Sequence, residues 1–121
     1  MTTPKKEMQL LTAADILGVE DDLEFKDIVV PKWKGTIRLQ QLTADESVKM
    51  HETLNKPEYA DMGMFIILTF SAVDKTGRKI FTLEDIDALR KRSLPILSFL
   101  QDEALALNKM GAEAAAALKK D

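Results

Sequence analysis

The chain has 121 residues and a mass of 13.6 kDa, which is the size of one domain. Its 45% hydrophobic and 31% charged residues are typical of a globular protein rather than a disordered or membrane protein. Because the sequence has no Cys and one His, it excludes disulfide scaffolds, thiolate metal sites and His-rich metal sites, and we expect no metal and no cofactor. The formal charge of -3 argues against a general nucleic-acid binder, whose phosphate contacts need a basic surface.

The sequence contains neither a predicted signal peptide nor a predicted membrane span. The apolar residues between Met8 and Leu17 are too interrupted for a signal-peptide core. The longest apolar stretch runs only from Met62 to Phe70, whereas a helix that spans a bilayer needs about 20 residues. We therefore expect a soluble protein of a cytosol that binds no membrane.

The pattern along the chain predicts one folded domain with short flanking segments. Residues 1–11 lack periodicity and are expected to form a flexible arm, and residues 111–121 form an Ala/Lys-rich tail. Between them, residues 12–110 are expected to form a single globular domain, which opens with a short helix from the capping residue Thr12 to Gly18. An acidic run then covers residues 20–27, and we expect it to be a solvated surface or a contact for a basic partner.

A β-hairpin is predicted after the acidic run. The segments Phe25 to Val30 and Thr36 to Leu42 have the composition of strands. In the second segment, Ile37 and Leu39 alternate with polar residues, which is the period of a half-buried strand. The five residues from Pro31 to Gly35 form the predicted hairpin loop.

The rest of the chain is predicted to be mainly helical. A capping box at Thr43–Glu46 begins a helix that runs to about Asn55, because Pro57 disfavours helix at the residue before it. A second helix is predicted from Glu58 to Val73, and a turn follows at residues 74–77.

Two further helices complete the predicted domain. Thr82 caps a helix that runs to Arg92, and Ser93 caps a last helix that ends near Asn108, with Pro95 tolerated in its first turn. The expected fold is therefore α+β and mainly helical, with a short N-terminal β-hairpin followed by about four helices in a single domain.

The predicted helix around Met62 is apolar on both faces. One face carries Met62, Phe65, Ile66, Thr69 and Val73, and the opposite face carries Ala60, Met64, Ile67, Leu68 and Ser71. A helix of this kind is either buried on both sides in the core or buries its second side against a partner. The first interpretation makes it the central core helix. The second interpretation is that the face with the flexible Met64 binds a helical partner.

Three other features each have two interpretations. Trp33, in the hairpin loop, either folds over the sheet as a lid on the core or is an exposed interface anchor. His51 is expected to be a satisfied boundary residue, because the sequence specifies no nucleophile or carboxylate beside it. The cations from Arg90 to Arg92 lie at a predicted helix C-terminus, and we expect a solvated helix end rather than a nucleic-acid contact.

No motif in the sequence predicts an enzyme. The chain lacks a glycine-rich phosphate loop, a nucleophilic Ser elbow and a paired-carboxylate spacing. We therefore expect a binding protein without catalytic residues.

Two stretches of the sequence resemble the tail assembly chaperones of long-tailed bacteriophages. The stretch from Asp27 to Glu46 resembles the opening of that family, which pairs a "V-P-x-W-x-G" hairpin with an "L-T-x-x-E" helix start. The stretch from Ser71 to Asp85 resembles the family's "V-D-x-x-G-x-x-x-F-T-x-E-D" segment. The resemblance covers about residues 23 to 108, and its motifs are turn glycines, helix caps and buried aromatic residues.

This resemblance implies a specific function. Such chaperones bind the long helical tape-measure protein in the cytoplasm of the host bacterium and keep it soluble while the tail tube polymerises around it, and they are absent from the mature virion. For this chain, the implied binding groove lies between the Met62 helix and the Phe99 helix. The residues expected to contact the partner are Trp33, Met62, Met64, Ile67, Leu68 and Phe99.

The resemblance also implies a second, longer product made by ribosomal frameshifting, whose extra domain recruits the tail-tube protein. The ending Lys119-Lys120-Asp121 is compatible with a slippery run of A-rich codons. The segment from Ala112 to Lys120 would then be a tether to that extension.

Other functions stay open as alternatives to the chaperone. The main one is a small adaptor that binds one folded phage or bacterial partner and self-associates as a homodimer through the Met62 helix. A DNA-binding regulator that uses Arg90 to Arg92 is a distant third, and an enzyme that uses His51 comes last.

Overall fold

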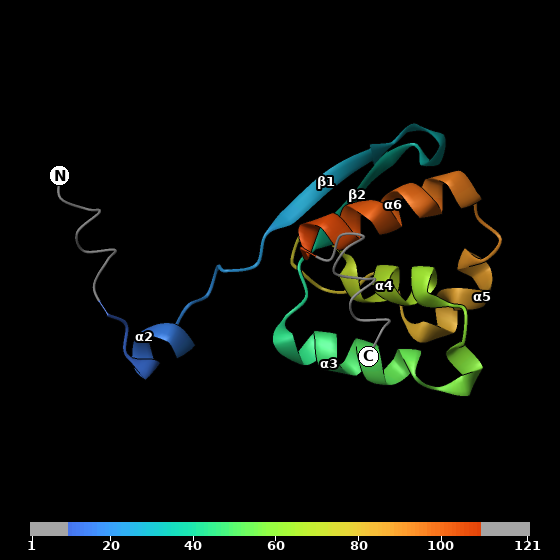
Figure 1. Cartoon of the computed structure of the whole chain (residues 1–121). Helices are drawn as coiled ribbons and strands as arrows, with labels where there is room; N and C mark the ends of the chain where they lie inside the picture. Colours follow the sequence, from blue (N-terminus) through green and yellow to red (C-terminus); the bar gives the residue numbers. More distant parts are fainter. Residues whose placement is uncertain (1–9, 110–121) are drawn as a thin grey trace.

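The computed structural model describes residues 10–109 and shows an α+β fold (Figure 1). A three-stranded antiparallel sheet has the order β1-β2-β3, and five helices and three short 3-10 helices accompany it in the described residues. The strands are β1 (Phe25–Val30), β2 (Gly35–Gln40) and β3 (Ala72–Val73). The α-helices are α2 (Ala13–Leu17), α3 (Ala44–Leu54), α4 (Gly63–Ser71), α5 (Ile86–Leu89) and α6 (Leu94–Leu107). The 3-10 helices are η1 (Pro31–Trp33), η2 (Pro57–Tyr59) and η3 (Leu83–Asp85). The predicted fold class is confirmed.

The hairpin forms where the sequence predicts it, with a shorter loop. Val30 pairs with Gly35, so the loop comprises residues 31–34 rather than the five residues expected. Pro31 begins the 3-10 turn η1, and Lys34 reverses the chain with a left-handed φ of 59°. Ile28 and Ile37 are paired and buried on the inner face of the sheet, as strand alternation requires.

The predicted single helix from Glu58 to Val73 is wrong at both ends. Pro57 begins the separate turn η2, and Asp61 then adopts a left-handed φ of 65°, which ends helical geometry before α4 begins at Gly63. At the other end, Ala72 and Val73 form β3, because they pair with Leu39 and Arg38 of β2. The sheet therefore gains a third strand that the helical pattern did not predict.

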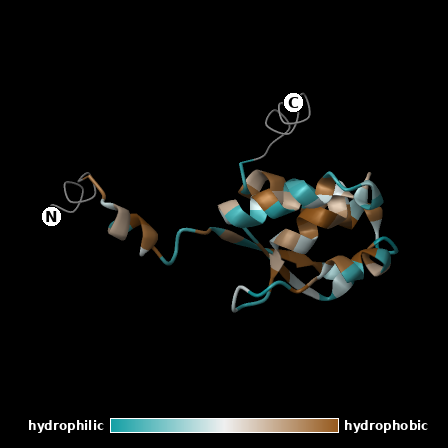
Figure 2. Ribbon diagram, turned by 90° about the horizontal axis from the view of Figure 1, so that it is seen from below, coloured by the Kyte–Doolittle hydropathy of each residue, from teal (hydrophilic) through white to brown (hydrophobic). Residues whose placement is uncertain are grey.

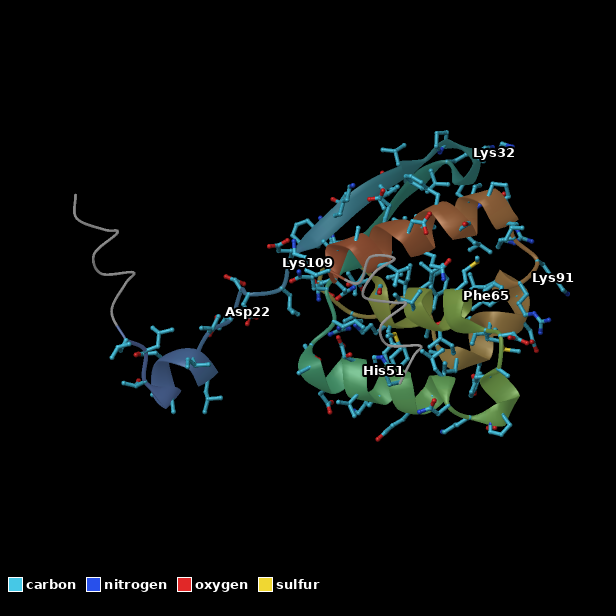
Figure 3. The ribbon with its side chains drawn as sticks, in the orientation of Figure 1. Asp22, Lys32, His51, Phe65, Lys91 and Lys109 are labelled. Atoms are coloured by element: carbon cyan, nitrogen blue, oxygen red, sulfur yellow. The ribbon has the colours of Figure 1, made fainter. Side chains whose placement is uncertain are left out.

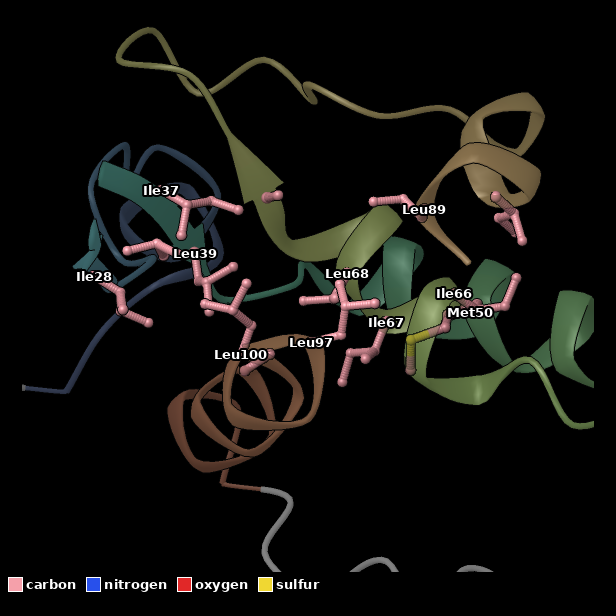
Figure 4. Packing of buried hydrophobic residues seen from close by; sticks show 14 residues of the cluster. Ile28, Ile37, Leu39, Met50, Ile66, Ile67, Leu68, Leu89, Leu97 and Leu100 are labelled. Carbon is pink, nitrogen blue, oxygen red and sulfur yellow. The ribbon is translucent and has the colours of Figure 1, made fainter. Parts of the chain in front are cut away.

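Helix α4 is the centre of the core. It packs against α3, α5, α6 and strand β2. Its residues Ile66, Ile67 and Leu68 are buried in one cluster with residues from the sheet and from α6 (Figure 4). A helix covered on every side needs apolar residues all round, which is the pattern that the sequence shows here.

Local capping fixes the remaining elements as predicted. Thr43 and Glu46 form a capping box at the start of α3, and Thr82 and Asp85 form another before α5. Ser93 caps α6 by accepting the Ile96 N–H at 3.4 Å. Helix α5 ends at Leu89, so the three cations that follow it lie in the turn before α6 rather than in a helix.

Helix α2 lies apart from the rest of the described structure (Figure 1). The connector after it is mainly hydrophilic, as Figure 2 shows. Of the flanking segments expected from the sequence, residues 1–9 and 110–121 lie outside the described residues, so the flexible arm and the Ala/Lys-rich tail stay predictions. Within residues 10–109, no helix is long and apolar enough to cross a membrane.

Candidate functional site

An apolar groove lies between the hairpin and the N-terminal half of α6. Its volume is about 560 Å³. The lining comes from the end of β1, the following turn and the first turns of α6: Val29, Val30, Pro31, Lys32, Ser93, Pro95, Ile96 and Phe99. Val29 is 69% exposed and Phe99 is 51% exposed, so the groove presents apolar side chains to solvent.

The local sequence explains why α6 leaves this face open. Leu97, Leu100 and Ala104 recur at helical spacing and are buried in the core. Ile96 and Phe99 are three residues apart, so they share a different face of the same helix. Pro95 sits in the first turn of α6, where it costs no intrahelical hydrogen bond.

The other wall of the groove is the edge of the sheet. The strand order places β1 at an edge, with β2 as its pairing partner. Ile28 and Val30 face the core, whereas Val29 between them is exposed. An edge strand has backbone N–H and C=O groups that no second strand takes up. The groove therefore combines apolar side chains from α6 with residues of a strand that pairs on one side only among the described residues.

Two ion pairs involve strand β1, and none of their residues lines the groove. Lys26 of β1 donates a hydrogen bond to Glu103 of α6, which ties the same two elements together beyond Phe99. On the outer face of the sheet, the Arg38 guanidinium bonds both carboxylate oxygens of Asp27 at 2.7 and 3.0 Å, and it lies 4.0 Å from the centre of the Phe25 ring. The hydrogen bond from Arg38 holds the pKa of Asp27 below its ordinary value.

The metal-ligating side chains and His51 were the sequence features with a chemical alternative. Residues 10–109 contain no group of three or more His, Cys, Asp or Glu side chains that could hold a metal ion. His51 on α3 is half-buried, and its Nδ1 lies 2.7 Å from the Ser47 carbonyl oxygen of the preceding turn. That contact is local to the helix, as expected for a boundary histidine.

The structure brings only one of the six predicted contact residues to the groove. Phe99 lines it, whereas Trp33 is half-buried and lines a separate pocket of about 240 Å³. Met62 and Met64 are half-buried beside the core. Ile67 and Leu68 are 3% and 1% exposed, so their side chains stabilise the interior. A role of these five in partner binding stays a prediction.

Sequence reasoning missed the other apolar residues of the groove. The sequence pattern could have indicated Ile96. It lies three residues before Phe99, and the two form a second apolar face on a helix whose first face fills the core. Val29 and Pro31 carry no comparable signal, because only the strand order shows that β1 lies at the edge of the sheet.

The fold matches a solved structure of known role. The structure of the bacteriophage HK97 tail assembly chaperone superimposes with a TM-score of 0.57, over 88% of this chain and 95% of that chain. The chain has the fold of that chaperone. The two sequences are 18% identical over the match, and the likeness supports the family resemblance seen in the sequence. No family model and no curated protein matches the chain.

Proposed function

We propose that this protein is a phage tail assembly chaperone that binds the tape-measure protein. It keeps that protein soluble while the tail tube polymerises, it acts in the cytoplasm of the host bacterium, and it is absent from the mature virion. In this proposal it is a binding protein, not an enzyme. The exposed apolar groove carries the proposal, and the fold shared with the HK97 tail assembly chaperone supports it.

The chemistry of the groove suits a helical, hydrophobic partner. An unassembled tape-measure helix exposes long apolar stripes, which are an aggregation hazard in water. A groove lined by Val29, Ile96 and Phe99 would take apolar side chains from one face of such a helix. Several such contacts share the binding energy, because each side chain is either partly buried or small. Binding of this kind releases the partner when the tube assembles.

Co-expression with the large helical protein encoded just downstream tests the proposal. The partner should stay soluble and co-purify with the wild-type chain, and Phe99→Asp should abolish both effects. Val48→Asp is the matched control, because Val48 is 56% exposed on α3, away from the groove. Ile67 was also expected to contact the partner, but Ile67→Asp cannot test binding. A charge at a position only 3% exposed would unfold the domain. A downstream protein whose solubility does not depend on this chain would refute the proposal.

The proposed longer product has an independent test. Residues Lys119 and Lys120 must be encoded within a slippery heptamer, and an open −1 reading frame must follow it. If both are present, the extension is expected to bind the tail-tube protein. If either is absent from the nucleotide sequence, the frameshift part of the proposal fails while the binding of the tape-measure protein is unaffected.

A further inference from the structure

Three consecutive cations form an exposed corner between α5 and α6. Arg90, Lys91 and Arg92 are all exposed, in a protein whose formal charge is -3. None of the ion pairs among residues 10–109 includes them. Figure 3 shows Lys91 on the opposite side of the molecule from the acidic Asp22. The corner is therefore a local positive patch on an acidic protein.

Backbone hydrogen bonds hold this corner rigid. The Arg90 N–H donates to the Ile86 carbonyl at 2.9 Å, and the Arg92 N–H donates to the Leu89 carbonyl at 2.9 Å. Ser93 then caps α6 directly after the third cation. A patch on a fixed backbone loses less entropy on binding than a patch on a flexible loop.

An apolar pocket of about 440 Å³ opens beside two of the cations. Ile80, Phe81, Ala88 and Leu89 supply its apolar lining, and Ile80 is 45% exposed. Lys91 and Arg92 also line it.

One carboxylate faces the same pocket. Asp85 belongs to the lining, but its Oδ2 accepts the Thr82 N–H at 2.8 Å as part of the cap before α5. No ion pair among residues 10–109 joins Asp85 to Lys91 or Arg92, so both cations can pair with a ligand.

We propose that this corner is a second interaction surface, which binds an acidic segment of a partner protein. One apolar side chain of that segment enters the pocket, and flanking carboxylates pair with Lys91 and Arg92. The apolar lining favours a protein segment over a DNA duplex, whose backbone would use the cations and leave the pocket empty. This surface shares no lining residue with the α6 groove, so the inference goes beyond the proposed function and does not depend on it.

Fluorescence anisotropy with short labelled peptides tests the inference on the full chain. The probe is a 14-residue peptide with two central Leu residues flanked by Glu, and a second peptide carries Gln in place of each Glu. At 150 mM salt, the Glu peptide is expected to bind at least tenfold more tightly than the Gln peptide. The double variant K91E/R92E should lose that binding at least tenfold, and Ile80→Ser should weaken it severalfold.

The matched control is K56E/K75E, which makes the same change in net charge at two exposed cations outside the pocket. It should bind the Glu peptide as the wild type does, and circular dichroism should show all variants folded. Equal loss in both double variants, or equal binding of both peptides, would overturn the inference. Tighter binding of a 14-base-pair DNA duplex than of the Glu peptide would assign the corner to nucleic acid instead. Self-association in light scattering that K91E/R92E abolishes would assign it to a second copy of the chain.

Discussion

Substitutions at two adjacent residues of α6 are expected to distinguish an effect on partner binding from an effect on folding. Phe99 is 51% exposed and lines the groove, whereas Leu100 is 0% exposed and lies in the core. Phe99→Ala is therefore expected to weaken binding of the tape-measure protein and to destabilise the free chain less than Leu100→Ala does, because about half of the Phe99 surface is already exposed. Leu100→Ala is expected to destabilise the fold by about 3–5 kcal/mol, the cost of removing a buried leucine and leaving a cavity.

The exposed surface area of Phe99 determines how much affinity the Phe99→Ala variant is expected to lose. A Phe side chain has roughly 200 Å² to bury, so about 100 Å² remains for a partner to cover. At about 25 cal/mol per Å², that area contributes about 2.5 kcal/mol to binding. A loss of that free energy corresponds to an affinity about sixtyfold weaker, since about 1.4 kcal/mol is tenfold.

A labelled segment of the tape-measure protein, titrated with each variant, measures the affinity, and urea unfolding measures the stability. Val48→Ala is the matched control, because Val48 is similarly exposed but lies on α3. It should change neither quantity appreciably. The reasoning would be refuted if Phe99→Ala bound as tightly as the wild type, or if Val48→Ala lost as much affinity as Phe99→Ala.

Three further predictions concern stability and pH. Thr43→Ala should lower the free energy of unfolding by about 1 kcal/mol, because it removes the cap of α3. Thr12→Ala is the control: it removes the cap of α2, which lies apart from the core, so urea unfolding should be unchanged. Ser71→Ala should raise the free energy of unfolding by about 1 kcal/mol, because the buried Ser71 hydroxyl has no hydrogen-bond partner among the described residues. The Arg38 hydrogen bond lowers the pKa of folded Asp27, so the stability that this pair contributes is full above about pH 4 and is lost as the pH falls through the lowered pKa. Asp27→Asn should therefore flatten the acid limb of a stability-against-pH curve measured by urea unfolding.

The helix caps, one turn and the first strand of this fold were predictable, because each depends on residues close together in the sequence. The capping boxes at Thr43 and Thr82, and the cap at Ser93, each involve residues within three positions of one another, so the sequence alone identifies them. The turn predicted at residues 74–77 ends in Gly77, whose φ of 87° is one that glycine adopts readily. The strand Phe25–Val30 has the predicted bounds.

Features that depend on distant parts of the chain were not predictable in this way. Ala72 and Val73 continue a helical pattern, but β2 is available to pair with them, and that pairing turns them into a strand. The break at Asp61 also has no decisive local signal, because aspartate occurs in helices as well as in turns, and it tolerates the left-handed conformation without requiring it. The prediction of a continuous helix over this segment was therefore wrong.

The same limit explains why the sequence pattern pointed to the Met62 helix as the one that needs a partner, whereas the structure leaves large apolar side chains exposed on α6. A helix that is apolar all round needs cover on more than one side. Helix α4 receives that cover within the chain, from α3 and α5 as well as from α6 and the sheet. Helix α6 packs against α4 and the sheet, and Leu94 and Phe99 stay 66% and 51% exposed. Both helices have the composition of buried elements, and only α6 keeps large apolar side chains in solvent. For that reason we expect a hydrophobic partner to bind along α6, and a substitution at Phe99 to be more informative than one anywhere on α4.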